Sequence, residues 1–182
     1  MTTETVPAPA AGPKTQLEVK PITWVVAGVG ALLCFVRFGF SGDAVVGSIF
    51  VGSLVVIAAT DLERRIIPDV VLVPASIVVL LLNIALHPKF EWIIAGAAAF
   101  AFFFVVALIN PKGLGMGDVK LAFLIGAGLG WNVVGALILG MLGAAVYAVA
   151  LVLTRPGAGA KTAFALGPFL SGAVIVVFFL AR

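Results

Sequence analysis

Residues 132–154 read NVVGALILGMLGAAVYAVALVLT and contain no charged side chain. Runs of about 18 or more apolar residues are long enough for a helix to cross the hydrocarbon core of a bilayer. Six other apolar segments accompany this one, at residues 22–36, 44–60, 70–86, 92–109, 119–129 and 164–181. The sequence therefore predicts an all-α, polytopic membrane helical bundle with about six or seven transmembrane segments.

The length of segment 119–129 leaves the number of crossings open. At about 1.5 Å per residue, this segment is too short for a hydrocarbon core of about 30 Å. Six full crossings with one irregular segment and seven complete crossings are therefore both compatible with the sequence. Small residues are frequent nearby, and Gly126 and Gly130 form a G-x-x-x-G spacing that favours close packing of helices.

The composition agrees with a membrane location. Hydrophobic residues make up 63% of the 182 residues, charged residues only 10%, and the mean hydropathy is +1.26. A soluble domain has about 25% charged residues, and the period-two alternation of a membrane barrel is absent. The net charge of +3 comes from scattered basic residues, which does not suggest a nucleic-acid partner. The lone cysteine, Cys34, excludes a disulfide framework or a cysteine-rich zinc site.

The chain divides into two parts of unequal size. Residues 1–20 are polar and rich in Ala, Pro and Thr, which predicts a disordered tail. Residues 21–182 form the predicted membrane domain. No compact basic start or convincing cleavage site marks a signal peptide, so the first apolar run is expected to be retained as a helix.

Basic residues predict the orientation. If every segment crosses the bilayer, Lys and Arg divide eight to three between its two sides, and the richer side is expected to be cytoplasmic. That side holds the tail and the loops 61–69, 110–118 and 155–163. The expected location is the plasma (inner) membrane of a prokaryote. The eight residues are Lys14, Lys20, Arg64, Arg65, Lys112, Lys120, Arg155 and Lys161, and the three are Arg37, Lys89 and Arg182.

Outside the tail, four of the eight acidic residues lie on this predicted cytoplasmic side: Asp61, Glu63, Asp69 and Asp118. Ionisable groups near membrane helices are costly and are therefore functional candidates. Asp61 ends an apolar helix, where a negative charge faces the unfavourable end of the helix dipole, although Arg64 or Arg65 would compensate for it. Asp69 follows Pro68, and this pair suits an ordinary helix start as well as a functional role.

Asp118 lies in the stretch NPKGLGMGDVK, residues 110–120, directly before an apolar segment. A helix cap would explain the aspartate but not the glycines at 113, 115 and 117, which allow unusual backbone conformations and close approach. Helix starts also bind anions. Lys120 alone is weak support for a phosphate, and the glycines do not match a Walker motif.

Asp61 and Asp118 together suggest aspartic peptidase chemistry. Two neighbouring carboxyl groups do not both ionise easily, so one retains a proton. The ionised member then takes a proton from the attacking water, while the protonated member polarises the peptide carbonyl. This chemistry needs no metal and no cofactor.

Three blocks of sequence closely resemble the type IV prepilin peptidases. Asp61 to Asp69, DLERRIIPD, is similar to the family's D-x-x-x-x-x-x-P-D block, and Gly115 to Lys120, GMGDVK, matches G-x-G-D-x-K. Residues 166–169, LGPF, are similar to a later F-G-P-F segment. The resemblance covers about residues 44–175. It implies that Asp61 and Asp118 are the catalytic pair and that Asp69, Gly115, Gly117 and Lys120 support the motif.

The resemblance also implies a substrate and a location. Members of the family remove short basic leaders from pilin and pseudopilin precursors, after a glycine, at the cytoplasmic face of the inner membrane. Bifunctional members have paired cysteine motifs and also methylate the new N-terminus. This chain has no C-x-x-C and resembles the short, peptidase-only members, so methyltransferase activity is not expected.

Two other classes of function are compatible with a small membrane bundle. A proton- or cation-coupled transporter would use Asp61 and Asp118 as a relay, but it would favour acids near the midplane and an internal repeat. Both acids lie near one interface, and no convincing repeat is present. A non-catalytic assembly component has no specific support. The sequence therefore favours the intramembrane aspartic endopeptidase.

Overall fold

A computed structural model describes residues 20–109, 113–154 and 166–181. Within these ranges the chain is helical and contains no strand, which confirms the all-α bundle. The predicted disordered tail lies outside the described residues except for Lys20. The helices are α1 (Pro21–Phe38), α2 (Gly42–Arg64), α3 (Asp69–Leu86), α4 (Glu91–Ile109), α5 (Met116–Leu129), the 3-10 helix η1 (Gly130–Asn132), α6 (Val133–Thr154) and α7 (Gly167–Ala181).

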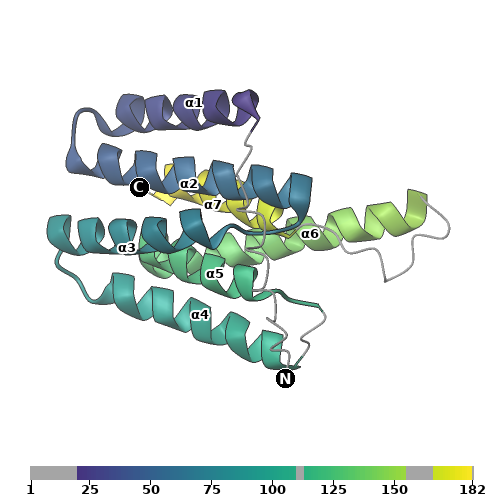
Figure 1. Ribbon diagram of the computed structural model, residues 1–182. Helices are drawn as coiled ribbons and strands as arrows, with labels where there is room; N and C mark the ends of the chain where they lie inside the picture. The colour runs from purple at the N-terminus through teal and green to yellow at the C-terminus, as the bar shows by residue number, and fades with distance from the viewer. Residues whose placement is uncertain (1–19, 110–112, 155–165, 182) are drawn as a thin grey trace, which may run out of the picture.

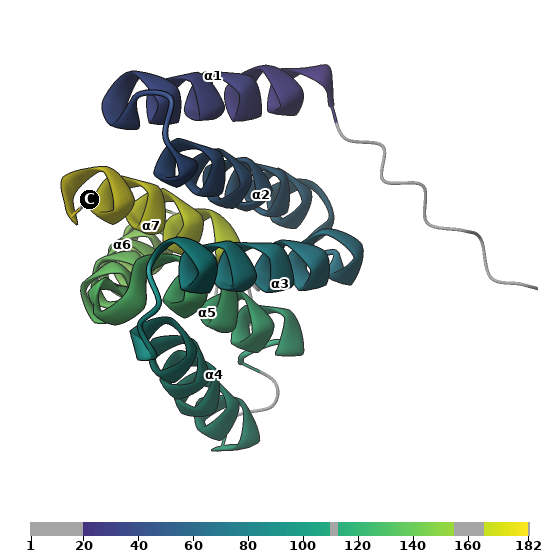
Figure 2. The same ribbon diagram turned by 90° about the vertical axis from the view of Figure 1, so that its left-hand side faces the viewer.

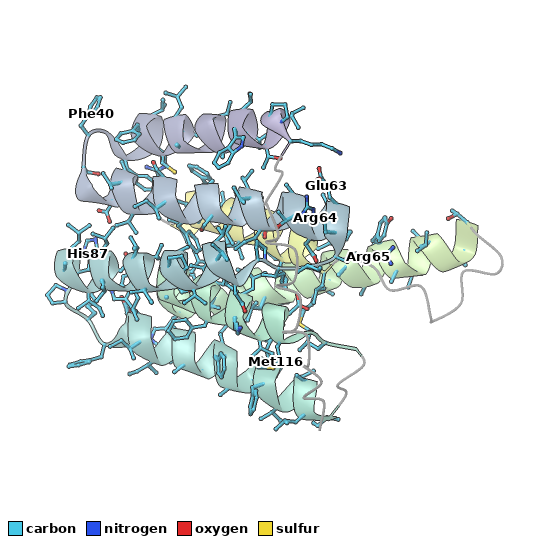
Figure 3. All side chains as sticks on the ribbon, viewed as in Figure 1. Phe40, Glu63, Arg64, Arg65, His87 and Met116 are labelled. Atoms are coloured by element: carbon cyan, nitrogen blue, oxygen red, sulfur yellow. The ribbon has the colours of Figure 1, made fainter. Side chains whose placement is uncertain are left out.

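Successive α-helices run in opposite directions, so most helix ends gather at two faces of the bundle (Figure 1). The C-terminal ends of α2 and α4 lie at the same face as the N-terminal ends of α3, α5 and α7, and α6 runs towards this face and projects beyond it. Figure 3 shows Glu63, Arg64 and Arg65 at this face and His87 at the opposite one. The three loops that the sequence assigned to one side therefore start and end on one side of the bundle.

The outer surface of the bundle is suited to lipid rather than water. Val36, Leu153 and Leu180 are each at least 75% exposed, and many other large apolar side chains are also exposed. Such a surface is typical of a membrane interface and not of a soluble monomer. Five helical stretches are long and apolar enough to span a membrane: α1, α2, α3, α4 and Met116–Leu151, which includes α5 and most of α6.

Helices α5 and α7 are shorter than the other α-helices. α5 has 14 residues, as the short segment 119–129 predicted, and α7 has 15. At 1.5 Å per residue they extend about 21 Å and 23 Å, less than the hydrocarbon thickness. Helix α7 begins at Gly167, and residues 164 and 165 of the predicted segment 164–181 lie outside the described residues.

Helix α5 is the centre of the bundle. It packs against α3, α4, α6 and α7, and Figure 2 shows it surrounded by these helices. Helix α1 lies at the periphery and packs mainly on α2. Nine residues of α5 are buried, and they are Val119, Leu121, Ala122, Leu124, Ile125, Gly126, Ala127, Gly128 and Leu129.

The contact between α4 and α5 depends on the absence of side chains. A Cβ atom at Gly126 would lie 2.6 Å from the carbonyl oxygen of Ala95 and 2.6 Å from the Cα of Gly96. These neighbours are backbone atoms, which cannot move without separating the helices. Small residues at helix crossings permit such close packing in membranes, and the packing interpretation of Gly126 is therefore confirmed.

We expect Gly126→Ala to destabilise the bundle. Its methyl group would overlap the α4 backbone, and overpacking of this kind costs roughly 1–3 kcal/mol. Thermal unfolding in detergent should show a lower midpoint than the wild type. Gly135→Ala is the matched control, because a Cβ atom there has nothing within 4 Å. Equal midpoints for the two variants would contradict the close crossing of α4 and α5.

Candidate active site

Asp61 lies in the last turn of α2, where only 6% of the residue is exposed. The helix ends at Arg65, whose left-handed backbone (φ 53°) directs its N–H to the carbonyl oxygen of Asp61 at 2.9 Å. The Arg65 guanidinium also attracts the Asp61 carboxylate electrostatically. The predicted compensation of an acid at a helix C-terminus is therefore present, and it comes from Arg65.

The start of α7 provides a second contact to Asp61. The backbone N–H of Gly167 donates a hydrogen bond of 2.9 Å to Oδ2 of Asp61, across 106 positions of sequence. A Cβ atom at Gly167 would lie 2.6 Å from the same oxygen, so this position requires glycine. Sequence reasoning noted the block LGPF but did not assign Gly167 to the site. The block's recurrence in the resembling family was the signal that could have placed it there.

Asp118 is the third residue of α5 and is partly buried. The N-cap of α5 is Gly115, so the interpretation of Asp118 as the helix cap is wrong. Its carboxylate instead reaches back to the backbone amide of Gly115, a contact that resembles the N3-to-N-cap half of a capping box. A Cβ atom at Gly115 would lie 3.5 Å from Asp118 Oδ2.

The two carboxyl groups meet at one face of the bundle. Asp118 is close enough to Asp61 for the two negative charges to repel each other. They belong to different helices, α2 and α5, as the peptidase hypothesis requires. The two acids are therefore neighbours in the structure, as the sequence predicted.

Gly117, which precedes Asp118, allows α5 to pack closely against the loop between α2 and α3. A Cβ atom at Gly117 would lie 2.9 Å from the Cβ of Ile67, in the loop between α2 and α3. Gly115 has an extended backbone (φ −78°), which other residues also adopt. At Gly115 the expected need for an unusual backbone conformation is therefore wrong. The space at Gly117 instead lets the first turn of α5 contact the loop that follows Asp61.

Asp69 and Lys120 form an ion pair between α3 and α5. Lys120 Nζ donates to Asp69 Oδ2 at 2.7 Å. Asp69 is the first residue of α3, but its N-cap is Pro68 and has no side-chain cap. The predicted helix start at Pro68 and Asp69 is therefore present, although Asp69 does not cap the helix with its side chain. Its carboxylate instead links the two sequence blocks that contain Asp61 and Asp118.

His87 and Asp43 lie away from the Asp61–Asp118 pair. His87 Nε2 is 2.9 Å from Asp43 Oδ1, at the opposite face of the bundle (Figure 3). Among the described residues, no group of three or more His, Cys, Asp or Glu side chains is placed to hold a metal ion.

Comparison with known proteins gives the family. Residues 48–181 match the model of the type IV leader peptidase family. The chain belongs to this family. The match agrees closely with the range 44–175 over which the sequence blocks predicted the resemblance. It gives no support to the transporter alternative.

Three relatives are named prepilin leader peptidase/N-methyltransferase. The protein from Bacillus subtilis (strain 168) is 31% identical over 157 residues, covering 80% of this chain and 63% of the relative. The proteins from Stutzerimonas stutzeri and Myxococcus xanthus (strain DK1622) are 29% and 26% identical, over 74% and 78% of this chain. The chain spans 49% and 45% of those two relatives. No solved structure matches the chain significantly.

The Asp69–Lys120 pair makes a testable contribution to the bundle. We expect Asp69→Lys and Lys120→Asp each to lower the midpoint of thermal unfolding in detergent. Each variant brings two like charges into direct contact between α3 and α5. The double variant Asp69→Lys/Lys120→Asp restores opposite charges and should recover most of the loss. The effect is expected to be below about 1 kcal/mol, because both side chains are partly exposed. Strictly additive losses in the double variant would show that the pair does not form.

Proposed function

We propose that the chain is an intramembrane aspartic endopeptidase that removes the leader peptide of prepilins or pilin-like precursors. The observation that supports this proposal best is the proximity of Asp61, in the last turn of α2, to Asp118, in the first turn of α5. Membership of the type IV leader peptidase family and the printed names of three relatives agree with it. The transporter alternative has no comparable support.

The two carboxyl groups divide the work of peptide hydrolysis. One is ionised and removes a proton from water, whose oxygen then attacks the carbonyl carbon of the scissile peptide. The other is protonated and donates a hydrogen bond to the carbonyl oxygen as negative charge develops there. The first carboxyl then gives its proton to the leaving nitrogen, and the C–N bond breaks. Repulsion between neighbouring carboxylates favours this singly protonated pair.

Water reaches this face more readily than the middle of the bundle. Residues 62–66, directly after Asp61, are all exposed, and several of them are charged. Asp61 itself is held by Gly167 and Arg65, so its carboxyl has a fixed position against which water and substrate are oriented. Preorganised groups of this kind reduce the reorganisation needed in the transition state.

We place this face on the cytoplasmic side. The support is the distribution of Lys and Arg along the sequence: eight of 11 lie in the tail, in the three loops that the sequence puts on the side of Asp61 or, for Lys120, near the start of α5. The leader of the precursor would then be cleaved in the cytoplasm, where the bilayer interface begins. Precursor and lipid bilayer are the partners that this proposal requires.

We expect Asp61→Asn and Asp118→Asn each to reduce leader removal at least about a hundredfold, because each removes one acid–base partner. The assay incubates the purified protein with a type IV prepilin in vesicles and follows the mature product. Glu63→Gln is the control, since Glu63 is a nearby acid that pairs with Lys20 at 3.1 Å and takes no part in the pair. Wild-type rates in either Asn variant would exclude the proposed dyad.

The contact at Gly167 gives a further expectation. Gly167→Ala would push its methyl group against Oδ2 of Asp61, so cleavage should fall by at least about tenfold while the protein remains folded. Gly172→Ala lies on the same helix with nothing within 4 Å of its Cβ and should cleave normally. If both variants cleave at the same rate, the position of Asp61 does not depend on Gly167.

The product should be unmethylated. Methylating members of the family have paired cysteines, whereas Cys34 is this chain's only cysteine. After incubation of prepilin with this protein and S-adenosylmethionine, mass spectrometry should show a mature N-terminus of unmodified mass. An added mass of one methyl group would contradict this expectation.

A further inference from the structure

Two hollows lie end to end between α4 and α6. The first has a volume of about 320 Å³ and the second about 240 Å³. Phe102 of α4 and Met141 of α6 line both, so the hollows form one groove along the two helices. We call it the α4–α6 groove. Its lining runs from Trp131 of η1 along α6 to Ala145, which is about 21 Å at 1.5 Å per residue.

The lining of the α4–α6 groove is apolar and contains no charged side chain. Alanines make it deep, because their short side chains leave room for a neighbour to approach closely. Larger side chains such as Phe102 and Met141 form its walls. The alanines are Ala95, Ala98 and Ala99 on α4 and Ala144 and Ala145 on α6.

One end of the groove adjoins both aspartates. Its last lining residues include Leu114 and Leu166. Leu114 precedes Gly115, whose amide faces the Asp118 carboxylate. Leu166 precedes Gly167, whose N–H binds Asp61. A segment lying in the groove therefore leads directly to the carboxyl pair.

We propose that the α4–α6 groove holds an apolar helical segment of the substrate, next to the scissile bond. The proposal rests on the function proposed above and names the substrate feature that the site selects. Because the lining of the groove is apolar, an occupant with free backbone N–H and C=O groups would be costly there. A helix satisfies these groups internally. The groove's length fits about 14 helical residues, with the peptide to be cleaved extending past Leu114 and Leu166 towards Asp61 and Asp118.

Another hollow, outside the α4–α6 groove, does not lead to Asp61 and Asp118 in this way. It has a volume of about 390 Å³ and lies among α3, α4 and α5, with Lys120 in its lining. The Lys120 ammonium is bound to Asp69. Lys120 also lies about 200° around α5 from Asp118, at 3.6 residues per turn. A segment in that hollow would meet the opposite side of α5 from the Asp118 carboxylate.

Two neighbouring alanines of α4 allow the α4–α6 groove to be compared with the hollow that contains Lys120. Ala98 lines the α4–α6 groove, Ala97 lines the other hollow, and both are exposed. We expect Ala98→Trp to raise the KM for a type IV prepilin at least tenfold with little change in kcat, and Ala97→Trp to leave both near wild type. The assay uses the full chain in vesicles of phosphatidylethanolamine and phosphatidylglycerol. A normal KM in Ala98→Trp, or a larger effect of Ala97→Trp, would overturn the docking proposal.

A crosslinking experiment identifies the occupant even if Ala98→Trp folds poorly. Photoreactive p-benzoylphenylalanine replaces Ile138, which lines the groove, or its neighbour Leu139, which lines neither hollow of the groove. The two are 53% and 50% exposed. In the Asp61→Asn background, Ile138 should crosslink to prepilin and Leu139 should not. Adducts only with lipid, or with a second copy of this chain, would overturn the proposal. If the wild type does not cleave prepilin at all, the proposed function fails instead.

Discussion

The close crossing of α4 and α5 is the constraint on which the rest of the bundle depends. In lipid, helices gain little by hiding apolar side chains from one another, so their association relies on packing. At Gly126 the α5 backbone meets the backbone of Ala95 and Gly96. This contact fixes the depth and rotation of α5, around which α3, α4, α6 and α7 pack. The first turn of α5, with Asp118, takes its position from the same contact.

Asp61 reaches this first turn through contacts at helix ends. Its own helix stops at Arg65, the loop that follows packs on Gly117 through Ile67, and α7 begins with the amide that binds its carboxylate. A nearly buried carboxyl needs such partners, because desolvation without them is costly. Three helices, α2, α5 and α7, therefore come together beside the two acids. The short lengths of α5 and α7 agree with this arrangement, since both begin at the site.

Sequence alone could predict the helices and the principal pair, because long apolar runs and scarce charges are local signals. It could not place Gly167 against Asp61, or Lys120 against Asp69. These contacts join residues 106 and 51 positions apart, and they depend on how the helices cross. In a soluble protein an apolar stripe would indicate the inner face of each helix. Here the helices are apolar on all sides, so the pattern does not reveal which faces touch.

The arrangement addresses a conflict between the two things that intramembrane hydrolysis requires. Water and ionised carboxyl groups are stable at the bundle face, where residues 62–66 are exposed, but an apolar substrate helix is stable in lipid. A site at the midplane would have to bring water and charge into hydrocarbon. A site at the face with a groove leading into the lipid keeps each component in its own medium. In the proposed reaction, only the peptide between them leaves its helix, at a face where water can satisfy its backbone. The specificity of such an enzyme would then depend on where the substrate helix begins.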